Sequence, residues 1–155
     1  MISAYFYSTD VGEIAIIGDG KGITNVCLRG MVEFPPDCVL QETSLIAECA
    51  HQLYEYFAGA RKKFALPLIF RGTDFQMLVW SALFTVPYAE TMSYGQVARI
   101  CKHPRAARAV GLACNKNPLL IVIPCHRIVG LDGRLSGYAA GVQLKEYLLG
   151  LEQKH

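Results

Sequence analysis

One stretch of this sequence reads Asn117-Pro118-Leu119-Leu120-Ile121-Val122-Ile123-Pro124-Cys125-His126-Arg127, and in it five apolar residues run into a proline, a cysteine, a histidine and an arginine. Five apolar residues are too few to span a membrane, and they are typical of a buried, strand-like segment. Pro124 donates no backbone hydrogen bond and keeps its predecessor extended, so we expect the buried segment to end there. The pattern predicts that Cys125 leaves the interior on stiff backbone, as a positioned nucleophile does.

The composition is that of a folded globular protein. Of the 155 residues, 52% are hydrophobic and 18% are charged, which excludes a disordered chain and is enough to build a sizeable core. The N-terminal residues 1–10 lack the basic and apolar segments of a signal peptide, and no apolar run has the length of a membrane span. We therefore expect no membrane partner and a cytoplasmic location, or a nuclear one if the organism is a eukaryote.

The charge is distributed unevenly along the chain. The net charge is −3 over residues 1–85 and +5 over residues 86–155. Ordinary scatter is one explanation at this chain length, and the other is that the C-terminal half binds a polyanion such as nucleic acid.

The six cysteines form no C-x-x-C pair, and no histidine stands at zinc-finger spacing from them. A chain with this much core and no secretion signal needs no disulfide framework, so we expect most of these residues to be buried free thiols. Cys125 alone has polar and basic neighbours in the sequence. We predict no metal site.

The first part of the chain has the pattern of a small antiparallel sheet with a helix. Turn residues separate three β-rich runs, and the helix that follows a proline-containing loop carries its apolar residues on one face. The expected strands are 4–8, 13–18 and 23–28, the loop is 30–41 and the helix is 43–58. We expect residues 1–72 to be an N-terminal α/β scaffold domain.

The second part, residues 73–155, is mostly helical in pattern. An amphipathic helix is expected over residues 74–86, and Ser93 with Gln96 has the form of a capping box that opens a helix through residue 100. Pro104 suits the first position of a further helix, 104–113, rich in small residues. Two short helices joined by a tight turn have helix-turn-helix dimensions. Nucleic acid is a sensible partner for such a pair, and a helix–helix contact is the competing explanation for the small residues.

The rest of the chain contains a glycine-rich loop, 129–141, and a final helix, 142–152. The loop is either a pocket wall or a surface connection. A thiol must be activated to attack at neutral pH, and His126 is the nearest base, although side chains of adjacent residues in extended backbone point to opposite sides. A bridging water would relieve that geometry. A carboxylate would orient the histidine, and the sequence does not decide among the acids of this half, which are Glu90, Asp132, Glu146 and Glu152.

Several motifs in order give the chain a family resemblance. The chain resembles the O6-alkylguanine-DNA alkyltransferases, also called methylated-DNA–protein-cysteine methyltransferases. The resemblance rests on Pro124-Cys125-His126-Arg127, which is preceded by Asn117-Pro118 and followed by Gly137-Tyr138 and 145–149. Ser93-Tyr94-Gly95 and 105–111 belong to the same pattern. The match is dense from residue 73 to residue 152, and it rests on length and strand pattern over residues 1–72. The fold implied is α/β (α+β), with an RNase H-like N-terminal domain and a C-terminal domain of DNA binding and alkyl transfer that holds a winged-helix-like helix-turn-helix.

The resemblance implies a role for each residue of the reaction. Cys125 would attack the alkyl carbon on guanine O6 and keep the group as a thioether, so that one protein repairs one lesion. His126 would be its base through a water, and Glu152 would orient His126. Asn117 would hold the turn between the recognition helix and the active site by side-chain hydrogen bonds. Tyr94 would lie by the DNA phosphate and donate a proton or hydrogen bond toward the departing guanine.

The resemblance also implies how double-stranded DNA would be bound, by a protein we expect to be a monomer. Arg108 would enter from the minor groove and fill the space that the flipped nucleotide leaves. The nucleotide has to flip out because a base stacked inside the duplex cannot reach the thiol. The further DNA and substrate contacts expected are Arg105, Ala106, Ala107, Cys114, Ile128, Tyr138 and Ala139. The backbone around Cys125, Ile128 and Ala139 would bind the guanine edge, and Tyr138 would line the pocket.

Three positions depart from the family pattern. His103 precedes Pro104 where members often carry a capping Asn, so we expect a looser start of the recognition helix. Ala140 replaces a glycine or a bulky residue in the pocket loop, and Cys114 is either a second modifiable thiol or a small packed residue.

Two other functions stay open at this point. One is a non-catalytic sensor or regulator that binds alkylated DNA, although sensors of that kind lack the cysteine. The other is a multiple-turnover cysteine hydrolase, which would leave Arg108 and the basic half unexplained.

Overall fold

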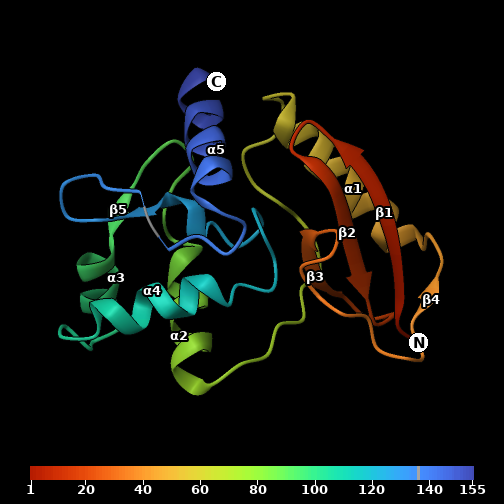
Figure 1. The fold of residues 1–155 in the computed structure, drawn as a ribbon, viewed down its shortest axis with the longest axis horizontal. Coiled ribbons are helices and arrows are strands. Elements are labelled where there is room, and N and C mark those ends of the chain that lie inside the picture. The colour runs from red at the N-terminus through yellow and green to blue at the C-terminus, as the bar shows by residue number, and fades with distance from the viewer. Residues whose placement is uncertain (136) are drawn as a thin grey trace. The chain divides into compact units, whose positions relative to one another are not determined.

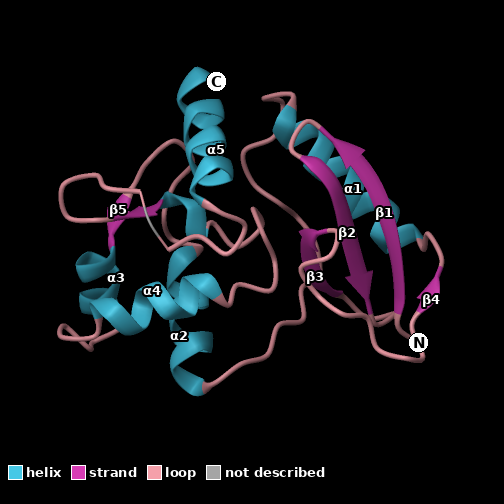
Figure 2. Cartoon of the chain, in the orientation of Figure 1, coloured by secondary structure: helices cyan, strands magenta, loops and turns pink. Residues whose placement is uncertain are grey.

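The computed structural model describes residues 1–135 and 137–155, and it divides the chain into two compact units, Met1–Phe70 and Arg71–His155. Figure 1 follows the chain from the N-terminal sheet to the C-terminal helices, and Figure 2 separates helices from strands by colour. Of the helices in the described ranges, none is long and apolar enough to cross a membrane.

The N-terminal unit is a four-stranded sheet with one helix. The strands lie in the order β3-β2-β1-β4, where β1 pairs antiparallel with β2, β2 antiparallel with β3, and β1 parallel with β4. Their bounds are β1 Ser3–Thr9, β2 Gly12–Gly18, β3 Ile23–Leu28 and β4 Val39–Leu40. The predicted antiparallel sheet is confirmed, and the short β4 lies within the segment that was expected to be all loop.

Helix α1, Ser44–Phe57, covers one face of this sheet (Figure 1). It begins where Thr43 accepts a hydrogen bond from the Ile46 N–H, which satisfies one of the first free donors of the helix. Ile16 of β2 and Ile46 and Leu53 of α1 are buried, and their side chains belong to the core of this unit. Their burial is what the alternating and helical apolar patterns of the sequence require.

The C-terminal unit is built on three helices that pack against one another, α2, α3 and α4. The bounds are α2 Asp74–Leu83, α3 Tyr94–Ile100 and α4 Ala107–Asn115, followed by a 3₁₀ turn at Cys125–Arg127 and by α5 Val142–Lys154. Two short strands, β5 Met92–Ser93 and β6 Ile128–Val129, pair in parallel. The predicted capping box is present, because the Ser93 side chain accepts from the Gln96 N–H and the Gln96 side chain accepts from the Ser93 N–H.

The expected helix over residues 104–113 begins later than the sequence predicts. Helix α3 ends in a Schellman motif, in which Lys102 has a positive φ of 61° and the His103 N–H donates to the Ala98 carbonyl. The chain then makes a turn through Pro104 before α4 begins, and the N-cap Ala106 supplies no side-chain hydrogen bond. Arg105 therefore precedes α4, and the expected placement of Arg105 and Arg108 on one helix is wrong.

The run 119–123 is buried as predicted but is no strand. Ile121 has a positive φ of 72°, and the Ile123 N–H donates to the Leu119 carbonyl, so the run folds into a tight turn with a single bridge between Leu120 and Ile123. A short apolar run occurs in buried strands, helices and turns alike, so the pattern predicted that the run is buried but not which backbone conformation it adopts.

Candidate active site

Asn117 ties the end of α4 to the segment that carries Cys125. Its Nδ2 donates to the Ile123 carbonyl at 2.9 Å, its Oδ1 accepts from the Leu119 N–H at 2.9 Å, and its own N–H donates to the Cys114 carbonyl at 3.2 Å. Asn117 is 7% exposed, so these bonds are shielded from water. The side chain closes the turn that replaces the expected strand.

Cys125 begins a 3₁₀ turn and is fully buried. Its N–H donates to the Ile123 carbonyl at 2.7 Å, the same oxygen that Asn117 binds. Burial raises the pKa of the Cys125 thiol well above its ordinary 9.0, and the neighbouring Cys114 raises it further, whereas Lys145 and Asn117 act in the opposite direction. The thiol therefore needs a base to become a nucleophile.

His126 is held by Glu152 from α5. His126 Nε2 lies 2.6 Å from Glu152 Oε2, and both side chains are fully buried. Burial lowers the pKa of His126 below its ordinary 6.5, against the opposing effect of Glu152, so we assign a neutral imidazole whose Nε2–H donates to the carboxylate. Its Nδ1 has no hydrogen-bond partner among the described residues. A buried imidazole nitrogen with a free lone pair is placed to accept a proton.

Arg127 holds the same carboxylate from the other side. Its Nε and Nη2 donate to Glu152 Oε1 and Oε2 at 2.9 and 3.1 Å, and its Nη1 donates to the Val86 carbonyl at 2.9 Å. The Ala89 N–H adds a fourth donor to Glu152 at 3.0 Å. A buried carboxylate is tolerated when its charge is paired and its lone pairs are bound, and here both conditions are met.

The sequence did not single out a role for Arg127, although it stands within the quoted motif. A signal was present, because Arg127 stands close in sequence to a buried apolar run, and an arginine is buried only when it is paired. Glu152, one of four acids that the sequence left open, is the one that the structure brings to His126.

Lys145 is a further residue that the sequence analysis missed. It is fully buried on α5, and its Nζ lies 3.1 Å from Tyr94 Oη. Burial lowers the pKa of Lys145 from its ordinary 10.5, while Cys114 and Cys125 oppose this shift. Lys145 and Glu152 lie seven residues apart on the buried face of α5 with Leu148, and this helical spacing is the signal that could have revealed them.

Tyr94, at the start of α3, lies against two glycines. A Cβ on Gly137 would lie 3.0 Å from Tyr94 Oη, and a Cβ on Gly111 would lie 3.8 Å from the Tyr94 ring. Gly137 has a positive φ of 67°, so both its conformation and its contact favour glycine. The tyrosine hydroxyl is thereby held near Lys145.

Tyr138 and Ile128 lie close to the cysteine and histidine. The Tyr138 ring is edge-on to His126, with 6.4 Å between ring centroids, and its hydroxyl has no hydrogen-bond partner in the described part of the chain. The Ile128 N–H already donates to the Cys125 carbonyl, so a hydrogen bond from Ile128 to a bound base has to use its carbonyl oxygen. Ala139 is half-buried.

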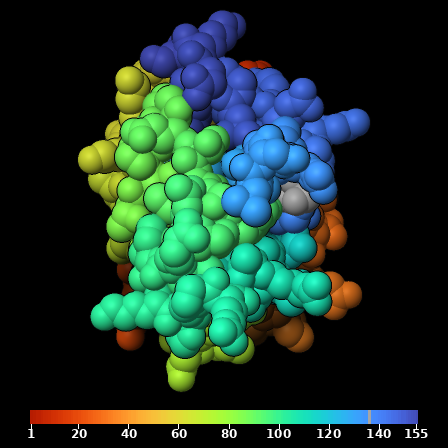
Figure 3. Space-filling model, turned by 90° about the vertical axis from the view of Figure 1, so that its left-hand side faces the viewer, coloured from red at the N-terminus to blue at the C-terminus, as the bar shows by residue number. Residues whose placement is uncertain are grey.

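The predicted DNA-contacting residues lie at the start of α4. Arg105 and Arg108 are exposed and Ala106 and Ala107 are half-buried, whereas Cys114, in the last turn of the same helix, is buried beside Cys125. Figure 3 shows one face of this unit, where the teal segment around α3 and α4 lies beside the blue loop that follows β6. The exposed Arg108 and the buried Cys114 thus lie in the first and last turns of one short helix.

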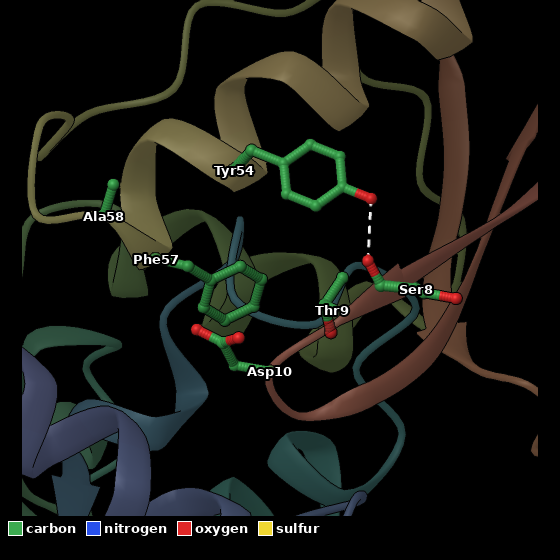
Figure 4. Close-up of a pocket in the computed structure, with 6 residues that line it drawn as sticks. All are labelled: Ser8, Thr9, Asp10, Tyr54, Phe57 and Ala58. Atoms are coloured by element: carbon green, nitrogen blue, oxygen red, sulfur yellow. Dashed lines mark hydrogen bonds between the residues drawn. The ribbon is translucent and has the colours of Figure 1, made fainter.

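A hollow of about 400 Å³ in the N-terminal unit has no comparable chemistry. It is lined by Ser8, Thr9, Asp10, Tyr54, Phe57 and Ala58, and Tyr54 Oη donates to the Ser8 carbonyl at 2.7 Å across it (Figure 4). No three His, Cys, Asp or Glu side chains converge on a possible metal position anywhere in residues 1–135 or 137–155.

Fold and site together place a buried cysteine next to a buried histidine–glutamate pair, and a single asparagine links that segment to the end of α4. Family models match nearly the whole chain. The model of the 6-O-methylguanine DNA methyltransferase ribonuclease-like domain matches residues 2–70, and that of the 6-O-methylguanine DNA methyltransferase DNA binding domain matches residues 74–154. The chain belongs to the 6-O-methylguanine DNA methyltransferase family.

Curated relatives carry one name. The methylated-DNA–protein-cysteine methyltransferase of Methanosarcina acetivorans is 43% identical over 148 residues, which cover 94% of this chain and 95% of that protein. The Mycobacterium leprae protein of the same name is 43% identical over 155 residues, covering 99% and 93%. A crystal structure of Mycobacterium tuberculosis OGT in complex with DNA superposes with a TM-score of 0.92 at 39% identity, covering 98% of this chain and 93% of that one.

Replacing Asn117 with alanine is expected to lower the free energy of unfolding by about 1–3 kcal/mol, because the buried Leu119 N–H loses its acceptor and the turn loses its cross-link. Denaturant unfolding followed by circular dichroism measures this loss. The exposed Asn115, at the end of α4, gives a matched control, and Asn115→Ala should change the free energy of unfolding little. Equal losses in the two variants would contradict the role of Asn117.

His126 is expected to make stability depend on pH. Because its pKa in the folded protein lies below 6.5, the unfolded chain binds the proton first as the pH falls, and folding loses up to about 1.4 kcal/mol per pH unit between 6.5 and the folded value. The free energy of unfolding, measured from pH 7.5 downward, should therefore fall less steeply for His126→Gln than for the natural protein. His155→Gln, at the exposed C-terminus, is the control, and a slope unchanged in His126→Gln would contradict a neutral buried His126.

Proposed function

We propose that this protein repairs DNA by removing alkyl groups from O6-alkylguanine in double-stranded DNA, through irreversible transfer to Cys125. The observation that carries the proposal is the linkage of the Cys125–His126–Glu152 set to α4 through Asn117. The names and family models of the relatives support the same activity. We propose that residues 73–155 carry DNA binding and transfer, and that residues 1–72 are the scaffold.

The reaction begins with loss of the Cys125 proton. The unpartnered Nδ1 of His126 takes it through a bridging water, and the imidazolium formed is stabilised by the Glu152 carboxylate. Lys145 favours the thiolate by its charge. The Cys125 sulfur then attacks the alkyl carbon, a sulfur–carbon bond forms as the carbon–O6 bond breaks, and guanine leaves with the electron pair.

The leaving guanine needs a proton or a hydrogen bond, and we assign this role to Tyr94. Its hydroxyl lies 3.1 Å from Lys145 Nζ, a cation that makes proton donation by the phenol easier. The product thioether has no acidic proton and does not hydrolyse under ordinary conditions, so each protein acts once. No cofactor takes part in this scheme, because the alkyl donor is the damaged base.

The base must leave the duplex to reach a fully buried thiol. We propose that Arg108 fills its place from the minor groove, because Arg108 is exposed on α4 and makes no hydrogen bond or ion pair with another described residue. The first N–H groups of α4 have no side-chain cap, which suits them to a DNA phosphate, and Arg105 adds charge beside them.

In the same proposal, the carbonyls of Cys125 and Ile128 and the backbone of Ala139 bind the guanine edge while Tyr138 lines the pocket. One copy of the chain supplies every residue of this scheme, which supports action as a monomer. Its substrate places the protein where the DNA is, in the cytoplasm or, in a eukaryote, in the nucleus.

The proposal is tested with duplex DNA that carries a radiolabelled methyl group on guanine O6. We expect one label per protein, recovered in the tryptic peptide 117–127, and none with Cys125→Ala. Cys101→Ala, which removes another buried thiol of the same unit, should transfer as the natural protein does. Binding without transfer would instead favour a sensor, and more than one event per protein would favour a hydrolase.

Arg108→Ala is expected to slow transfer from duplex DNA at least tenfold, which corresponds to about 1.4 kcal/mol, because the flipped state loses its filling side chain. Transfer from free O6-methylguanine base should change much less, since no stack has to be opened. Arg105→Ala removes an equal charge from the turn before α4, and we expect a smaller loss from it on duplex DNA. Equal losses on duplex and free base in Arg108→Ala would rule out the intercalating role.

A further inference from the structure

The turn before β5 contains a residue in a backbone conformation that alanine rarely adopts. Ala89 has a positive φ of 65°, in the left-handed region that favours glycine. It is the third residue of a β-turn that begins at Pro87, because the Glu90 N–H donates to the Pro87 carbonyl at 3.2 Å. A strained conformation of this kind persists only where the surrounding structure holds it, and such residues cluster at functional sites.

Two consecutive residues of α5 hold this turn. The Ala89 N–H donates to Glu152 Oε1 at 3.0 Å, and the Ala89 carbonyl accepts from Gln153 Nε2 at 2.7 Å. Both polar backbone groups of the strained residue are therefore bonded to the end of one helix. The alkyl-transfer scheme uses Glu152 and gives Gln153 no task.

The Ala89 N–H completes the hydrogen bonds of the Glu152 carboxylate. Oε2 lies 2.6 Å from His126 Nε2 and accepts from Arg127 Nη2, and Oε1 accepts from Arg127 Nε. A carboxylate offers about four lone-pair positions, so with the Ala89 N–H each of them has a donor. Three of these donors come from residues 126–127, and the fourth comes from the strained turn. A backbone donor cannot rotate away as a side chain can, so it fixes the plane of the carboxylate.

The segment that carries Ala89 also contacts Arg127. Arg127 Nη1 donates to the Val86 carbonyl at 2.9 Å, and the guanidinium carbon lies 5.5 Å from the centroid of the Tyr88 ring, over its face. The segment therefore holds the carboxylate directly and holds its arginine partner as well. A change in the turn would disturb both at once.

We propose that Gln153 and the backbone of Ala89 are positioning residues for the base of the proposed reaction. Gln153 holds the strained turn, so that the Ala89 N–H points at Glu152. Glu152 in turn orients the His126 imidazole for removal of the Cys125 proton. The inference rests on the proposed function, because alkyl transfer is the reaction in which His126 acts as a base. Both residues act through the carboxylate rather than on the substrate.

The first test is Gln153→Ala in the full-length protein. Without this donor the strained turn relaxes toward ordinary backbone, and the Ala89 N–H leaves the carboxylate. Single-turnover transfer from saturating duplex DNA that carries O6-methylguanine should slow about fivefold, a small part of what a positioned general base contributes, while Kd for that DNA stays unchanged. Gln143→Ala, at an exposed glutamine in the first turn of α5, is the matched control and should transfer at the natural rate.

A second background separates positioning from a general loss of packing. Ala89→Gly keeps both backbone groups and removes the steric cost of the positive φ, so the turn no longer depends on Gln153. In the Ala89→Gly background, Gln153→Ala should slow transfer by less than about twofold, because the two changes act on one conformational preference. A side chain that only packed α5 against its neighbours would cost the same in either background.

Proton NMR follows the same turn without DNA. The Nε2–H of His126 lies in a buried 2.6 Å hydrogen bond, whereas the other three histidines of the chain are exposed, namely His51, His103 and His155. We expect one slowly exchanging downfield ring N–H resonance in the natural protein. The resonance should be lost in Gln153→Ala and should be present again when Ala89→Gly is added.

Transfer at the natural rate in Gln153→Ala, with an unchanged His126 resonance, would overturn the proposal, and so would an equal slowing in both backgrounds. A natural protein that transfers no label from duplex DNA would instead refute the proposed function. The resonance then still decides whether Gln153 positions His126, so the two failures are distinguishable.

Discussion

The geometry of the candidate active site depends on the hydrogen bonds that the buried Glu152 carboxylate accepts. It receives His126 Nε2 at 2.6 Å, two donors from Arg127 and the Ala89 N–H, and so joins α5 to the 3₁₀ turn of the cysteine and to the segment before β5. A charge with no water around it is stable only with such partners. The same bonds that satisfy Glu152 turn the free nitrogen of His126 away from it, and leave that nitrogen able to accept a proton.

Asn117 holds the segment that precedes Cys125, as Glu152 holds the residues that follow it. The three hydrogen bonds of Asn117 connect the end of α4 with the turn at residues 119–123, and the Cys125 N–H donates to the same Ile123 carbonyl. In the proposed function, the exposed Arg108 and the Cys125 thiol are therefore joined through α4 and one hydrogen-bonded turn. Rigid placement of this kind is how a protein lowers the entropic cost of a bimolecular reaction.

Burial also explains why the site is built from opposed effects. It raises the pKa of Cys125 and lowers those of His126 and Lys145, so for each group burial works against the charged form. The lysine cation counteracts this for the thiol, and the neighbouring Cys114 works against it. The fully buried thiol is kept from the surrounding solution.

The sequence by itself determined the elements whose cause is local. Apolar periodicity located β1, β2, β3, α1 and α2, and the Ser93 capping box began α3. The ordered motifs around Pro124-Cys125-His126-Arg127 indicated the family that the comparisons established. It also led to Asn117 and, among several acids, to Glu152, although only by resemblance. Burial of 119–123 followed from composition alone, because five apolar residues are costly to expose.

Tertiary structure decided what depends on distant partners. A strand pattern gave way to a turn because Asn117 supplied bonds that a strand would have found in a neighbouring strand, and α4 began late because α3 ended in a Schellman motif. The contact of the buried Lys145 with Tyr94 and the clamp of Arg127 on Glu152 join residues from separate elements. The local sequence pattern shows which side chains are apolar. Only the folded chain shows which polar groups bind one another in the buried interior.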